Sequence, residues 1–133
     1  MRLVGIPIFL LTILPIAFNQ RPTISSTPPI EVVAAVAPEC PAKATIGKVE
    51  VQVVVTLDGY FGNVVHADSL GVRSTFSDVS ERAAMLWKFA PTNANAKQKL
   101  TFVFEVFSKN DRTRIAATTF IPPYKVVVEH PEE

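Results

Sequence analysis

Apolar residues recur at every second position in the middle of the chain, which is the pattern of a strand with one face against a core. Four valines at alternate positions form the apolar face of this predicted strand: Val49, Val51, Val53 and Val55. The Asp58-Gly59 pair that follows predicts a tight type I′ hairpin turn, in which both central residues need positive φ. The alternative is that Gly62-Asn63 extends the loop or marks a bulge. We expect the second strand of this hairpin over Val64 to Ser69.

A helical period comes next. Val79, Ala83, Leu86 and Ala90 lie at helical spacing with Trp87 beside them, and Pro91 ends the segment. Near its start, Asp78 and Glu81 stand three residues apart, as capping partners do. We expect this helix to pack on the sheet with Trp87 in the core, because a tryptophan on the apolar side of a helix buries a large area.

Strand-like alternation returns after the helix. Leu100 to Phe107 predicts a third strand, Arg114 to Ile121 is rich in β-forming residues, and Pro122-Pro123 separates that stretch from a last candidate strand, Tyr124 to Glu129. An unpaired edge on the third strand would be an aggregation hazard. The connection is long enough for the tail to fold back, so we expect the tail beside the third strand.

This order of elements predicts an α+β domain in two layers, a small antiparallel sheet with one helix packed on it and a further C-terminal strand where the tail pairs. The 133 residues are enough for one compact domain, and a chain with 48% apolar and 19% charged residues can build a packed core. The formal net charge is +1 and no basic stripe is visible, so nucleic acid is not an expected partner.

The N-terminus indicates export. Arg2 is followed by an apolar run, Leu3 to Phe18, that is shorter than the roughly 20 residues a membrane span needs. We interpret residues 1–20 as a secretory signal peptide, with an uncleaved inner-membrane anchor left open as the alternative. Residues 21–41 have the composition of a proline-rich linker, and residues 42–133 form the predicted domain. The expected location is the periplasm or cell envelope.

Residues with catalytic or ligand chemistry are few. His66 and His130 are distant in sequence and lie in different predicted elements, and no Cys or Glu pair stands at ligand spacing beside them. Asp68 and Ser69 follow His66, but neighbours on one strand point to opposite faces, so a triad is not expected. Cys40 is the single cysteine, which excludes an internal disulfide; an intermolecular one stays open. We predict a protein that is not an enzyme, with no catalytic residue, metal or cofactor.

The order of these motifs resembles a known family. The stretches "CPAKATIGKVEVQVVVTLDGYFGNVVHADSLG", "FSDVSERAAMLWKFAPT" and "KLTFVFEVF" are similar to the C-terminal domain of TonB-type energy transducers, of the TonB/TolA C-terminal kind. The positions that carry the resemblance are Pro41, Gly47, Asp58-Gly59, Ser69, Trp87-Lys88-Phe89 and Pro91.

The resemblance implies a periplasmic protein-binding domain that couples to outer-membrane receptors in transport. Such domains accept a short receptor segment as an added strand beside the strand that follows the helix, by β-augmentation. The residues of this implied partner-binding edge are Leu100, Thr101, Phe102, Val103, Phe104, Glu105, Val106 and Phe107. The implied partner is a receptor segment or another envelope protein, membrane contact involves only an uncleaved N-terminus, and a homodimer is left open. The alternative function is a free-standing structural or inhibitory module of the envelope.

Overall fold

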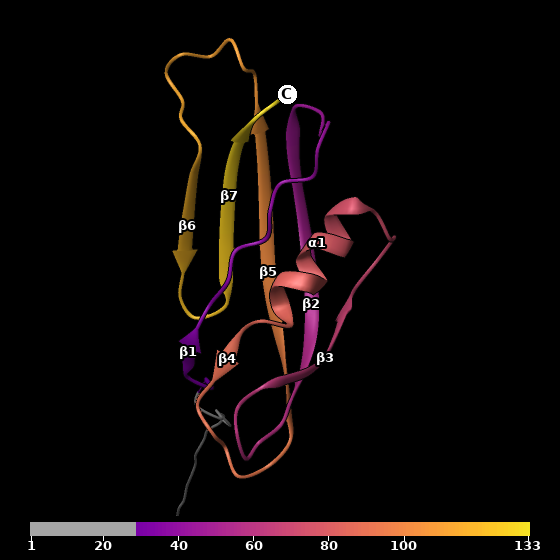
Figure 1. Cartoon of the computed structure of the whole chain (residues 1–133), viewed down its shortest axis with the longest axis vertical. Helices are drawn as coiled ribbons and strands as arrows, with labels where there is room; N and C mark the ends of the chain where they lie inside the picture. The colour runs from indigo at the N-terminus through magenta and orange to yellow at the C-terminus, as the bar shows by residue number, and fades with distance from the viewer. Residues whose placement is uncertain (1–28) are drawn as a thin grey trace, which may run out of the picture.

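The computed structural model describes residues 29–133, which form a five-stranded sheet with one helix on it (Figure 1). The predicted signal peptide and the first part of the linker lie outside the described residues. The elements in chain order are β1 (Val32–Ala34), β2 (Gly47–Leu57), β3 (Val64–Ser69), α1 (Thr75–Ala84), β4 (Lys88–Phe89), β5 (Ala96–Phe107), β6 (Ala117–Ile121) and β7 (Lys125–Pro131). The α+β class with one helix on a sheet is confirmed, and no helix within residues 29–133 is long and apolar enough to cross a membrane.

The sheet has the strand order β3-β2-β5-β7-β6. All neighbouring pairs are antiparallel except β5 and β7, which run parallel from Thr101 opposite Lys125 to Phe107 opposite Pro131. The sheet is therefore mixed rather than purely antiparallel. The prediction that the tail folds back beside the third strand is confirmed.

The core lies between the sheet and the layer formed by α1, Trp87 and the segment that contains β1. The alternating residues of β2 and β5 face this layer, as their pattern predicts, and the tail adds two valines to it. The buried residues on this side are Val51, Val53, Val55, Leu57, Leu100, Phe102, Phe104, Val126 and Val128.

The helix is capped differently from the prediction. Its N-cap is Ser74, which exchanges hydrogen bonds with Ser77 in a capping box, while Asp78 lies in the first turn. The helix also ends at Ala84, so that Lys88 forms part of β4 and the predicted helical position Leu86 is 67% exposed. The sequence pattern extended the helix too far because Trp87 is buried beyond its end.

The hairpin between β2 and β3 is not a two-residue type I′ turn. The backbone nitrogen of Asp58 donates to Asn63, the nitrogen of Gly62 donates to Asp58, and only Gly62 among the loop glycines has positive φ, at 74°. Gly59 is needed for another reason: a Cβ there would lie 2.2 Å from the backbone oxygen of Ala94. The loop is thus longer than a two-residue turn and includes Gly62 and Asn63, and its tip is packed against the chain that precedes β5.

Residues 29–41, expected in the linker, are packed on the domain as an N-terminal strap. The Trp87 indole nitrogen donates to the oxygen of Val36 at 2.8 Å, and the Tyr124 hydroxyl donates to the oxygen of Ile30 at 2.8 Å. The backbone nitrogen of Ala90 also donates to Glu31. The boundary predicted at residue 42 is therefore too late, because these contacts use backbone carbonyls that a proline-rich composition does not reveal.

Candidate functional site: the sheet and its edges

The predicted binding edge, Leu100 to Phe107, lies inside the sheet. On one flank β5 pairs with β2, from Gly47 opposite Val106 to Leu57 opposite Ala96, and on the other flank it pairs with β7. The tail therefore occupies the implied binding edge, as expected for a tail that lies beside the third strand, and it satisfies the backbone groups that a partner segment would use.

The tail strand is anchored by its alternate side chains. Val126 is fully buried and Val128 is 6% exposed, and both face the core, whereas Val127 and Glu129 face the opposite side of the sheet and are half-buried. Tyr124, just before β7, reaches the strap; burial raises the pKa of its hydroxyl, which donates to Ile30. Any segment that takes the place of β7 needs apolar side chains two residues apart.

The connection from β5 to β6 is fastened over the face of the sheet that α1 does not cover. The Arg114 guanidinium lies 4.6 Å from the centroid of the Phe107 ring and forms ion pairs with Glu105 at 3.3 Å and Glu129 at 3.5 Å. These two carboxylates come from β5 and β7, so a single cation bridges the strand pair. A cation over an aromatic ring in this position also shields the ring from water.

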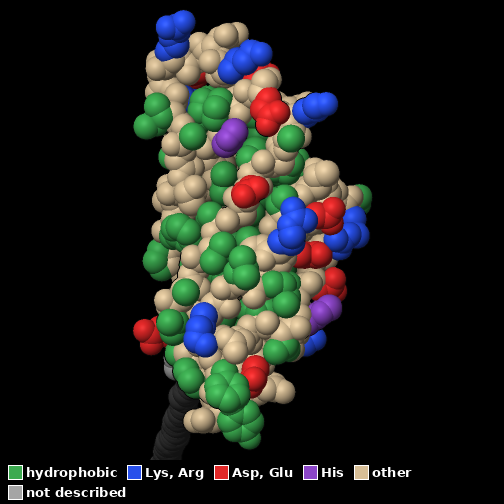
Figure 2. Space-filling view, in the orientation of Figure 1, with side chains coloured by type: hydrophobic (Ala, Val, Ile, Leu, Met, Phe, Trp, Pro, Cys, Tyr) green, Lys and Arg blue, Asp and Glu red, His purple; other side chains and the backbone are tan. Residues whose placement is uncertain are grey.

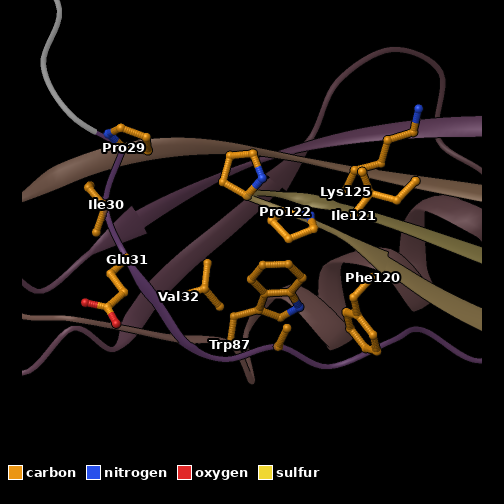
Figure 3. Close-up of a pocket in the computed structure, with 11 residues that line it drawn as sticks. Pro29, Ile30, Glu31, Val32, Trp87, Phe120, Ile121, Pro122 and Lys125 are labelled. Atoms are coloured by element: carbon orange, nitrogen blue, oxygen red, sulfur yellow. The ribbon is translucent and has the colours of Figure 1, made fainter.

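A cavity of about 420 Å³ separates the strap from the turn between β6 and β7. Its apolar walls include Ile30, Val32, Trp87, Phe120 and Pro122. In Figure 3 the charged ends of Glu31 and Lys125 point away from this space, so it offers apolar contacts and few polar ones. The turn end of the tail hairpin is consequently less closely packed than the rest of β7.

The outer side of β3 is covered by contacts that the sequence did not predict. The backbone nitrogen of Leu70 donates inward to Gln52, so the preceding nitrogen, that of Ser69, points outward and donates to Glu81 Oε2 at 2.8 Å. The Ser69 hydroxyl donates to the same oxygen at 2.6 Å, and Arg73 donates to both carboxylate oxygens of Glu81. The bonds from Arg73 and then from Ser69 lower the pKa of Glu81 to about 2.

The residues considered for chemistry stay apart. His66 is exposed on β3, while His130 is half-buried on β7 with its Nδ1 2.8 Å from the oxygen of Pro131. Cys40 is half-buried in the strap, and burial, with a smaller contribution from Glu133, raises the pKa of its thiol. Within the described residues no three His, Cys, Asp or Glu side chains are grouped so as to hold a metal ion.

Comparison of the chain with protein-family models, with curated proteins and with solved structures finds no match in any of the three.

Proposed function

We propose that this chain is an exported protein-binding domain of the TonB-like kind, which accepts an extended segment of an envelope partner as a strand beside β5. In the described structure the chain's own β7 occupies that position, parallel to β5. This occupied position is the observation that carries the proposal: the sheet already holds, beside the strand that follows the helix, a segment that joins it by backbone pairing.

The tail then acts as an internal competitor. Release of the tail exposes Val126 and Val128. The burial of each stabilises the structure in which β7 pairs with β5 by about 1.5–3 kcal/mol. The cavity beside Phe120 and Pro122 reduces the van der Waals contacts that hold the turn end of the β6–β7 hairpin. Replacement of the tail by a partner segment therefore begins at that end. A partner segment must supply equivalent apolar side chains at alternate positions, and it supplies no catalytic group.

A pair of engineered disulfides tests this exchange in the full chain with Cys40→Ser. Val103→Cys with Val127→Cys joins partners in the β5–β7 register and locks the tail in place. Gln52→Cys with Thr101→Cys joins β2 to β5 on the same face of the sheet and leaves the tail free, which makes it the matched control. The probe is a fluorescein-labelled peptide with the sequence of Tyr124–Pro131, followed by fluorescence anisotropy.

We expect the reduced proteins and the oxidised control to bind this peptide, and the oxidised tail lock to bind it at least about tenfold more weakly. A peptide with lysine at the positions of Val126 and Val128 should bind none of them. Equal binding to the oxidised and reduced tail lock would place the peptide at another edge. An absence of binding to every form would contradict a strand-accepting function and favour the free-standing module.

A further inference from the structure

The five-stranded sheet has two outer strands, β3 and β6, and their outer edges differ in how far other residues cover them. An outer strand presents unpaired backbone groups that can pair with another chain, and proteins usually cover or charge such an edge. The contrast between the two edges carries an inference that is independent of the proposed function.

The β3 edge is covered at both ends. At its start, Asn63 pairs with Lys88 of β4, and the Lys88 ammonium donates to the oxygen of Phe61 and to the side-chain oxygen of Asn63. At its other end the outward groups of Ser69 are held by Glu81 from α1. The exposed Asp68 adds a charge to the strand. These features leave little room for another strand.

The β6 edge has none of these protections within residues 29–133. Its sequence is Ala-Thr-Thr-Phe-Ile with no charged residue, and it pairs only with β7, on its inner side. Phe120 is 47% exposed and Ile121 42% exposed. Figure 1 shows β6 as the outermost strand of the sheet on its side, and in Figure 2 the charged side chains gather over α1 and β3 rather than over the middle of β6.

We propose that β6 pairs antiparallel with β6 of a second copy of this chain, about a two-fold axis that passes through Thr119. This register sets Thr118 opposite Phe120 and Ala117 opposite Ile121, so that each pair lies on one face of the joined sheet. All five β6 residues pair, and the two prolines that follow stay outside the ladder.

The chemistry of the edge favours a second copy over a charged partner. The strand carries no charge to attract an acidic or basic segment, and its self-pairing brings no like charges together. The two-fold axis is perpendicular to the sheet, so the two five-stranded sheets join into one sheet of ten strands with both helices on the same face. Pairing over five residues is a small interface, which predicts a weak dimer that depends on concentration.

Cysteine crosslinking in the full chain with Cys40→Ser tests the register. Thr119→Cys places a thiol on the axis, where it meets its own copy. Thr118→Cys, on the same exposed strand, is displaced from its copy along the ladder, and Val65→Cys is a control on the covered β3 edge, where Val65 is 57% exposed. Each protein is oxidised mildly and run on a gel without reductant.

We expect Thr119→Cys to form at least about ten times more disulfide-linked dimer than either control, since only its sulfurs come within bonding reach. In sedimentation, Thr119→Lys should shift the Cys40→Ser protein to monomer, and Val65→Lys should not, because only the first sets two charges face to face. Equal crosslinking of all three variants, or a sedimentation profile unchanged by Thr119→Lys, would overturn the proposal. Crosslinking of Thr119→Cys to a different protein in place of its copy would overturn it as well.

Discussion

Ser69 and Glu81 join the outer strand of the sheet to the helix: the backbone nitrogen and the hydroxyl of Ser69 both donate to Glu81 Oε2, at 2.8 and 2.6 Å. Arg73 holds the same carboxylate from the solvent side, at 2.9 Å. One acidic side chain thus satisfies the outward backbone group of β3 and ties α1 to it, which an isolated surface ion pair would not do.

These bonds predict that the free energy of unfolding falls at acidic pH. They lower the pKa of Glu81 from 4.5 to about 2, so between these values the unfolded chain binds more protons than the folded one. The stabilisation from Glu81 is therefore complete above about pH 4.5 and is lost as the pH falls towards 2. Glu81→Gln should flatten the decline in the free energy of unfolding over this range, measured by urea denaturation at several pH values.

The exposed carboxylate Glu50 on β2 provides the control. Glu50→Gln should leave the acid slope close to that of the parent chain. If Glu81→Gln declines as steeply as the parent, the carboxylate does not carry the stabilisation assigned to it.

Much of the sheet could be predicted from the sequence because its strands follow simple alternation. The faces of β2 and β5, the position of β3 and the return of the tail all follow from apolar residues at every second position. The buried place of Trp87 was also predictable, and its 3% exposure confirms it.

The remaining errors have a common physical cause, which is that backbone contacts distant in sequence leave no side-chain pattern. The strap is held through the carbonyls of Ile30 and Val36, and Gly59 is required by the approach of Ala94. The sheet is mixed rather than antiparallel because the tail pairs with β5 in parallel, and an alternating pattern does not give the direction of a strand. The protection of β3 by Glu81 is likewise hidden, since the three-residue spacing of Asp78 and Glu81 indicates a helix cap instead.

Gly62 should be irreplaceable in the hairpin loop. Its φ is 74°, and a Cβ would lie 1.7 Å from the backbone oxygen of Phe89. Gly62→Ala should therefore lower the free energy of unfolding by more than about 2 kcal/mol, from backbone strain together with the clash. Gly71 has a similar φ of 87° but open space around its Cβ position. Gly71→Ala should cost only about 1–2 kcal/mol, and equal losses in the two variants would show that the clash is relieved.

Replacing Ser80 with alanine should stabilise the folded protein. The serine side chain is fully buried in α1, and its hydroxyl has no hydrogen-bond partner among the described residues. Ser80→Ala removes an unsatisfied polar group and adds a better helix former, so the free energy of unfolding should rise by about 1 kcal/mol. Ser77→Ala, which removes half of the capping box, should lower it by about 1 kcal/mol. A loss of stability in Ser80→Ala would indicate that a buried water completes the site.

Trp87 should be the largest single contributor to the core on the helix side. Its ring lies 6.1 Å from Phe102 and 6.0 Å from Phe89, and its indole nitrogen fastens the strap at Val36. Trp87→Ala should lower the free energy of unfolding by about 3–5 kcal/mol. Trp87→Phe keeps an aromatic ring but leaves the Val36 carbonyl without its donor, so it should cost about 1–3 kcal/mol. Circular dichroism is the suitable measurement, because the chain has no other tryptophan to report unfolding by fluorescence.

Hydrogen exchange should show the strap losing protection in both variants. Intact protection of the strap in Trp87→Phe would mean that packing, and not the indole hydrogen bond, holds it on the domain.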